Sequence, residues 1–92
     1  MKPQNFLFIL SDQHHRMASG AYGHPVVQTP HLDALAARGT RFQNAYTNCP
    51  ICVPARASLA TGRYVHQIGY WDNGHPYDGV IPSWHQRLRE QD

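Results

Sequence analysis

A run of five consecutive apolar residues near the start of the chain, Phe6 to Leu10, constrains the fold more than any other feature. Because the run is continuous rather than alternating, it predicts a strand over 5–10 that is covered on both faces, as in the middle of a parallel sheet. The run is far shorter than the roughly 20 residues of a membrane-spanning helix. Polar residues 11–13 follow at once, which argues against a secretory signal. We therefore expect no membrane partner and a cytoplasmic location.

The composition favours one small folded unit without a nucleic-acid partner. Hydrophobic residues make up 41% of the 92 residues, which is enough for one core and too little for two domains. The net charge is +2 and no run of like charges occurs, so a nucleic-acid surface is not indicated. Seven of the eight basic residues are arginine, a residue that binds oxyanions with two parallel hydrogen bonds.

The middle of the chain predicts a strand–helix–strand arrangement. After a polar loop over 11–28, Thr29 can cap a helix that begins at Pro30, and Gly39 is a stop signal. The alternating segment 40–47 predicts a second strand with Phe42 turned inward. This order of elements is typical of an α/β fold with a parallel sheet.

The second half predicts two further helices. Pro54 is expected to begin a helix that runs to about residue 60 and is ended by Gly62. Residues 63–80 show little periodicity, and 82–91 predicts a helix. Two strands and three helices would leave sheet edges exposed, so we expect the opening segment of a larger α/β enzyme rather than a finished domain.

The segment Cys52-Val53-Pro54-Ala55-Arg56 predicts a site for anion chemistry. A thiol stands directly before a helix that begins at Pro54, and the start of a helix presents unpaired amides and partial positive charge. Arg56, one turn later, can hold an oxyanion by two-point contact. A nucleophile, amides and an arginine together suit the transfer of an anionic group.

The pair Cys49 and Cys52 has two other interpretations. The Cys-x-x-Cys spacing is found in redox pairs and in half of a zinc site, where His14, His15 or His66 could supply the missing ligands. A buried structural thiol is the simpler interpretation of Cys49. A small redox or metal-binding module is therefore an alternative class of function.

The stretch from Cys52 to Arg63 resembles the signature of the type I sulfatases, which is Cys-x-Pro-x-Arg, a helix of small residues and Thr-Gly-Arg. Residues 5–13 resemble the first strand of that family and its metal-binding end. Residues 29–42 resemble its next helix and strand. The segments 70–73 and 81–84 are similar to the branch of choline sulfatases and phosphonate monoester hydrolases. The resemblance covers essentially the whole chain.

The resemblance implies an α/β fold, the alkaline-phosphatase-like α/β/α sandwich with a mostly parallel sheet. Residues 1–92 would form the N-terminal segment of a single catalytic domain. The implied activity is hydrolysis of a small-molecule sulfate monoester, and the alternative is hydrolysis of a phosphonate monoester or a phosphodiester. The family needs further residues downstream, so we expect the 92 residues alone to be non-catalytic. The missing C-terminal part of the same protein is then the partner, and the complete enzyme is expected to be a homo-oligomer.

The resemblance also implies the catalytic group. In the type I sulfatases the signature cysteine is oxidised to Cα-formylglycine, which here would arise from Cys52. Its hydrate attacks sulfur with one hydroxyl and displaces the alcohol. The second hydroxyl then loses its proton, which expels the sulfate and restores the aldehyde. Arg56 would orient the hydrate and neutralise developing charge.

The remaining implied residues bind metal and substrate. Asp12 and Gln13 would hold a divalent cation together with the group formed from Cys52. Oxygen donors suit Ca²⁺, Mn²⁺ or Mg²⁺, and glutamine in place of a second aspartate weakens the case for Ca²⁺. Asn73 would contact the sulfate group, and His75 would line the same pocket.

Overall fold

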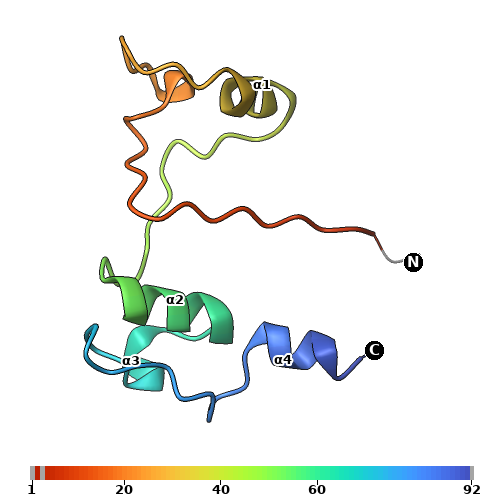
Figure 1. The fold of residues 1–92 in the computed structure, drawn as a ribbon, viewed down its shortest axis with the longest axis vertical. Helices are drawn as coiled ribbons and strands as arrows, with labels where there is room; N and C mark the ends of the chain where they lie inside the picture. The colour runs from red at the N-terminus through yellow and green to blue at the C-terminus, as the bar shows by residue number, and fades with distance from the viewer. Residues whose placement is uncertain (1, 3, 92) are drawn as a thin grey trace. The chain divides into compact units, whose positions relative to one another are not determined.

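The computed structural model describes residue 2 and residues 4–91, and it divides the chain into two compact units, Met1–Gln43 and Asn44–Asp92. The first unit contains the short 3₁₀ helix η1 (Gly20–Tyr22) and helix α1 (Pro30–Arg38). The second contains α2 (Cys52–Thr61), α3 (Val65–Ile68) and α4 (Trp84–Arg89) (Figure 1). The described residues contain no strand, and none of their helices is long and apolar enough to cross a membrane.

The strand predicted over 5–10 is not formed. Residues 4–10 lie outside any helix or strand and run as an extended trace in Figure 1. Their apolar side chains face solvent, with exposed fractions of 84% for Phe6 and 72% for Ile9. A strand needs neighbouring strands to pair its amides and carbonyls, and the described residues supply none. The prediction of a buried central strand is therefore wrong for this chain by itself.

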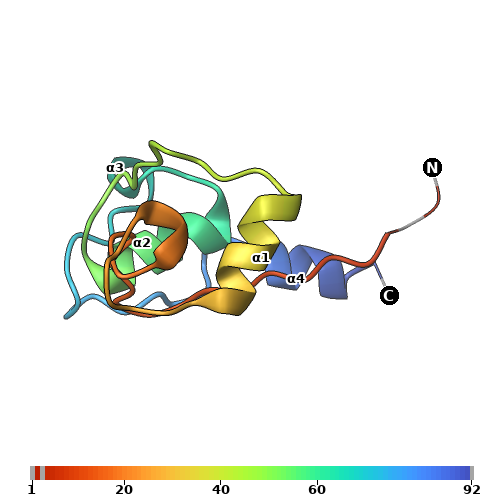
Figure 2. The same cartoon turned by 90° about the horizontal axis from the view of Figure 1, so that it is seen from above.

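Helix α1 has the bounds that the sequence predicts, but its start is held differently. It begins at Pro30 and Gly39 follows it, with the Gly39 amide donating to the Leu35 carbonyl. Thr29 does not cap it: the Thr29 hydroxyl donates to Asp33 Oδ1 (2.8 Å) and accepts from the Gly20 amide (2.9 Å). These bonds attach α1 to η1, which lies beside it in Figures 1 and 2.

The second predicted strand, over 40–47, is also absent. Phe42, expected to point inward, has 69% of its side chain exposed. The carbonyls that would pair in a sheet are taken by side chains of the first unit. Tyr22 donates to the Phe42 carbonyl (2.7 Å), and Arg16 donates to the Gln43 carbonyl (2.6 Å).

Helix α2 is the centre of the second unit and contacts both α3 and α4. The predicted end is confirmed, because Gly62 follows the helix with a φ of 68°, a left-handed conformation that glycine adopts without strain. The predicted start is two residues late, since the helix begins at Cys52. Pro54 therefore occupies the third position, where its missing amide costs no helical hydrogen bond. Pro54 and Ala57 are buried and face the rest of the unit.

The two shorter helices of this unit differ in how well the sequence indicates them. Helix α4 is shorter than the predicted 82–91 and begins after Ser83, whose hydroxyl accepts from the Gln86 amide (3.3 Å). The Gln86 side chain in turn accepts from the Ser83 amide (2.6 Å), which completes a capping box. Helix α3 was not predicted, and neither was η1, because each is too short to show periodicity.

Candidate active site

Cys52 is the first residue of α2, a position that places its side chain at the open end of the helix. The thiol is free and the residue is exposed. Ile51 precedes it in an extended conformation and accepts the Ala55 amide (2.9 Å) through its carbonyl. The amides of the first turn have no acceptor within the helix. The sequence suggests a nucleophile that precedes the helix. In the structure, a nucleophile formed at Cys52 would instead lie beside the backbone amides of the first turn.

Arg56 lies on the same side of α2 as Cys52. The two residues are four positions apart, a spacing that puts side chains above one another on one helix face. Arg56 is exposed, so its side chain lies at the surface of the helix. The helix thus presents a thiol and a cation from one face, which suits the binding of an oxyanion at its start.

Asn73 meets the start of α2 from a loop that is distant in the sequence. Its side-chain oxygen Oδ1 accepts a hydrogen bond from the Val53 amide, with 3.0 Å between nitrogen and oxygen. Val53 directly follows Cys52, so the structure brings Asn73 to the turn that carries the thiol. Cys52, Arg56 and Asn73 are therefore gathered at one end of one helix.

The loop over 70–78 carries Asn73 and is held by an aromatic cluster. Tyr70 is buried, and its ring packs against His75, with 5.1 Å between ring centroids, and against Tyr77 at 5.7 Å. The Tyr70 hydroxyl donates to Asp78 Oδ1 (2.5 Å). This bond raises the pKa of Tyr70 and lowers the pKa of Asp78, because it favours the neutral phenol beside the ionised carboxylate. The His75 ring packs on Tyr70 at the loop surface.

Asp12 and Gln13 lie in the first unit, on an exposed turn that follows the extended segment. Gln13 has a φ of 54°, the left-handed region that residues with a side chain seldom occupy. Their oxygen donors fit a hard divalent cation, although two residues supply fewer ligands than such a cation takes. The described residues contain no group of three or more His, Cys, Asp and Glu side chains that could complete the set.

The same observations bear on the alternatives for the cysteines. Cys49 and Cys52 are unbridged, and Cys49 is partly exposed rather than buried. The histidines next to Asp12 have local roles: His15 Nδ1 accepts the Met17 amide (3.1 Å), and His14 is exposed. Zinc binding by these side chains has no support in the described part of the chain.

A polar network that the sequence does not indicate fixes the other end of α2. Ser58 is buried, and its hydroxyl donates to the Arg63 carbonyl (2.6 Å) and accepts from Asn48 Nδ2 (2.8 Å). Asn48 Oδ1 accepts the Val65 amide (3.1 Å), which begins α3. Ser58 lies in the middle of the signature. Of this network, only the position of Ser58 on the buried face of α2 could have been predicted from the sequence, by a helical projection.

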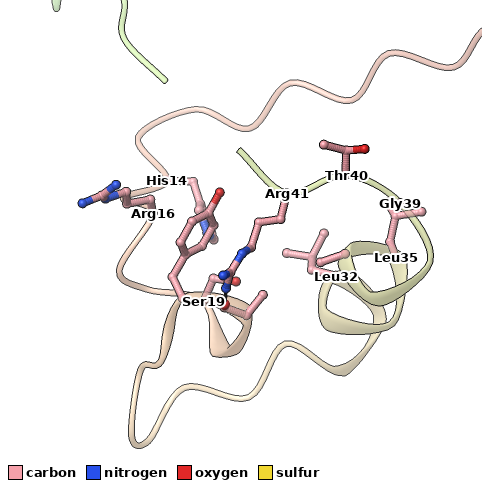
Figure 3. A pocket seen from close by; sticks show the side chains of 11 residues that line it. His14, Arg16, Ser19, Leu32, Leu35, Gly39, Thr40 and Arg41 are labelled. Atoms are coloured by element: carbon pink, nitrogen blue, oxygen red, sulfur yellow. Dashed lines mark hydrogen bonds between the residues drawn. The ribbon is translucent and has the colours of Figure 1, made fainter. Parts of the chain in front are cut away.

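The first unit contains a hollow of about 520 Å³ between η1, α1 and residues 39–41. Figure 3 shows Arg41 extending across it toward Ser19. The Arg41 guanidinium donates to the Ala21 carbonyl and lies over the Tyr22 ring, 5.0 Å from its centroid. None of the residues predicted to bind or transform a sulfate ester lines this hollow, so we do not assign it to the site.

Comparison with known proteins identifies the family. The sulfatase family model matches residues 4–91. The chain is 47% identical over 73 residues to the uncharacterized sulfatase YidJ of Escherichia coli K12, covering 79% of this chain and 15% of that protein. It is 47% identical over 70 residues to human N-sulphoglucosamine sulphohydrolase, covering 76% of this chain and 14% of that enzyme. It is 36% identical over 89 residues to the N-acetylglucosamine-6-O-sulfatase of Bacteroides thetaiotaomicron, covering 97% of this chain and 16% of that enzyme.

The match covers only a small part of each relative. The chain spans about 15% of the length of the curated sulfatases that it matches. No solved structure matches the chain significantly. The choline-sulfatase-like branch stays a prediction, since the relatives named above do not test it. The match to almost every residue of the chain nevertheless settles its membership: this chain belongs to the sulfatase family.

Proposed function

We propose that this chain supplies the nucleophile and its supporting residues to a sulfatase that hydrolyses sulfate monoesters. One observation carries the proposal: the exposed Cys52 begins α2, with Arg56 one turn later and Asn73 bonded to the adjacent Val53 amide. The guanidinium of Arg56 and the side-chain NH₂ group of Asn73 can both donate hydrogen bonds. Such a set is suited to a tetrahedral oxyanion that gains charge during transfer.

The sulfatase family generally uses Cα-formylglycine and a divalent metal, and the residues present fit both. The exposed free thiol of Cys52 is open to oxidation, and the hydrate of the formylglycine would supply a nucleophilic hydroxyl and a second hydroxyl that can release the sulfate adduct. Asp12 and Gln13 would hold the cation, Ca²⁺ or Mn²⁺ with Mg²⁺ as a third candidate, and the cation would polarise the ester oxygens. Further ligands would come from elsewhere in the enzyme.

The residues of this chain would act mainly by binding and orientation. Arg56 would pair with oxygens of the sulfate group and balance their charge. Asn73 would donate from its amide nitrogen, because its oxygen is already bonded to Val53. His75, packed on Tyr70, would form part of the wall of the substrate pocket.

We further propose that the chain is the N-terminal segment of a single catalytic domain with an alkaline-phosphatase-like α/β/α fold. The exposed apolar run at 6–10 supports this, since such a run is suited to the middle of a parallel sheet when neighbouring strands are present. The missing C-terminal part would supply those strands. A homo-oligomeric enzyme in the cytoplasm remains our prediction, which gel filtration and cell fractionation would test.

We expect the substrate to be the sulfate ester of a sugar. Relatives of the chain are named for sulfated amino sugars: an N-acetylglucosamine-6-O-sulfatase, an N-sulphoglucosamine sulphohydrolase and an N-acetylgalactosamine-6-sulfatase. These names support a sulfated hexosamine as the class to be tested first. A phosphonate monoester is the competing substrate.

The decisive experiment measures the modification and the turnover together in the full-length enzyme. Trypsin should release residues 42–56 as one peptide, and its mass should show conversion of the Cys52 side chain to an aldehyde. Turnover of p-nitrophenyl sulfate should fall roughly 10³-fold or more in Cys52→Ala. Cys49→Ser is the matched control and should keep its activity.

Three results would contradict the proposal. They are an unmodified Cys52 in an active enzyme, full activity of Cys52→Ala, and a preference for a phosphonate monoester over every sulfate ester. Loss of activity in Cys49→Ser, together with a disulfide between Cys49 and Cys52 in the wild-type enzyme, would favour the redox alternative instead.

A further inference from the structure

We propose that Asn73 is a positioning residue, which caps α2 from outside the helix and thereby fixes the turn that carries Cys52. The inference rests on the proposed function, since it assigns a structural task to a residue that was expected only to contact sulfate. Its basis is the hydrogen bond from the Val53 amide to Asn73 Oδ1, which joins residues 20 positions apart. The bond reaches the residue next to the nucleophile.

Helix α2 needs an external cap because its own sequence provides none. The residue before the helix is Ile51, whose side chain has no hydrogen-bond acceptor, and no side-chain cap is formed there. Pro54 has no amide to satisfy, and the Ala55 amide already bonds to the Ile51 carbonyl. Of the remaining first-turn amides, that of Val53 is satisfied by a side chain from another segment. Helix α4 shows the usual alternative, with Ser83 as its own cap.

The loop that presents Asn73 is braced on both sides of that residue. Asp72 Oδ1 accepts the Gly74 amide (2.8 Å), which makes a tight turn around Asn73. The ends of the loop are joined by the bond between the Tyr70 hydroxyl and Asp78. Tyr70 is only 4% exposed, so the base of the loop is anchored in the small core of the second unit. Asn73 therefore reaches α2 from a fixed turn rather than from a free loop.

The cap also sets the orientation of the Asn73 amide. The NH₂ group of asparagine cannot accept a hydrogen bond, so the Val53 bond assigns Oδ1 to the helix and leaves the NH₂ group as the other end. Within the Asn73 side chain, only that NH₂ group can donate to an oxyanion at the start of α2. One bond thus orders two things at once: the turn that carries the nucleophile and the donor that faces the substrate.

The test compares Asn73→Ala with Asn73→Asp in the full-length enzyme. Aspartate keeps an oxygen acceptor and favours the positive end of the helix, but it replaces the NH₂ donor by a charged oxygen. Amide hydrogen exchange of Val53 should accelerate about fivefold to 30-fold in Asn73→Ala, which is the range expected for one lost cap. The exchange should return to the wild-type rate in Asn73→Asp. Exposed Asn44→Ala is the matched control, with wild-type exchange and activity.

Kinetics with p-nitrophenyl sulfate should separate the two variants. Asn73→Ala should lower kcat roughly 10- to 100-fold, because the nucleophile loses its fixed position. Asn73→Asp should mainly raise KM, since its helix start is intact and its carboxylate repels the sulfate group. Wild-type exchange at Val53 in Asn73→Ala, or a wild-type kcat for that variant, would overturn the inference. A wild-type enzyme without turnover would instead overturn the proposed function, and the exchange rates would still test the cap.

Discussion

The Ser58 hydroxyl is the polar contact whose removal best tests the energetics of α2. It connects three segments, because it accepts from Asn48 before the helix and donates to the Arg63 carbonyl after it. Ser58 is 7% exposed, so a methyl group can fill its site with little change in shape. Ser58→Ala removes both hydrogen bonds and leaves the packing nearly intact.

The expected loss of stability follows from two opposing contributions. Each hydrogen bond adds about 0.5–1.5 kcal/mol net to the free energy of unfolding, so losing two costs about 1–3 kcal/mol. Alanine is the better helix former by about 0.5 kcal/mol, which offsets part of that loss. Asn48 and Arg63 are exposed and water can replace some of what they lose. We therefore expect Ser58→Ala to cost about 1 kcal/mol.

The assay is urea unfolding of the full-length enzyme, combined with a double-mutant cycle. Asn48→Ala, Ser58→Ala and the double variant are compared, and exposed Ser11→Ala is the control. Because the two side chains share a hydrogen bond, the two losses should fail to add by about 0.5 kcal/mol or more. Strictly additive losses, or an unchanged midpoint in Ser58→Ala, would refute the assigned network.

Three further predictions concern Gly62 at the end of α2, the pair of Tyr70 and Asp78, and the metal. Gly62→Ala should destabilise the protein by about 1–2 kcal/mol, because alanine is strained at a φ of 68°; an unchanged melting temperature would contradict this. The stabilisation by the pair of Tyr70 and Asp78 should be present above pH 3.8 and lost as pH falls through the lowered pKa of Asp78. This stabilisation should also be present below pH 10.0 and lost as pH rises through the raised pKa of Tyr70. The melting temperatures of wild type and Tyr70→Phe should therefore differ between these two limits and converge at low and at high pH. Chelation with EDTA should abolish turnover by the full-length enzyme, and Asp12→Asn should need more added metal for half-maximal rate; equal metal requirements would argue against Asp12 as a ligand.

Features that depend on local sequence were predictable. The bounds of α1 follow from Pro30 and Gly39, and the end of α2 follows from Gly62, since proline and glycine restrict or release the backbone wherever they stand. The start of α2 was placed two residues late because proline is favoured anywhere in the first turn, not only at its first position. The sequence therefore placed Cys52 just before the helix, and only the structure shows that Cys52 and Arg56, four positions apart, share it.

Features that depend on distant residues were not predictable. The strands expected at 5–10 and 40–47 require partners, and hydrophobicity alone does not show whether the chain contains them. The bond between Val53 and Asn73 joins a helix start to a loop that has no periodic signal. The role of Asn48 is equally hard to predict, since an asparagine in a loop is as consistent with a solvated turn as with a bridge between two helices.

The open apolar run at 6–10 also governs how this polypeptide behaves at high concentration. Five large side chains on an extended backbone form a ready template for a second extended segment, and nothing charged interrupts them. The isolated 92 residues should therefore precipitate through this edge long before α2 loses its shape. Leu7→Lys or Ile9→Lys would keep the peptide in solution for spectroscopy, but the charge would disfavour burial of that position in a complete sheet.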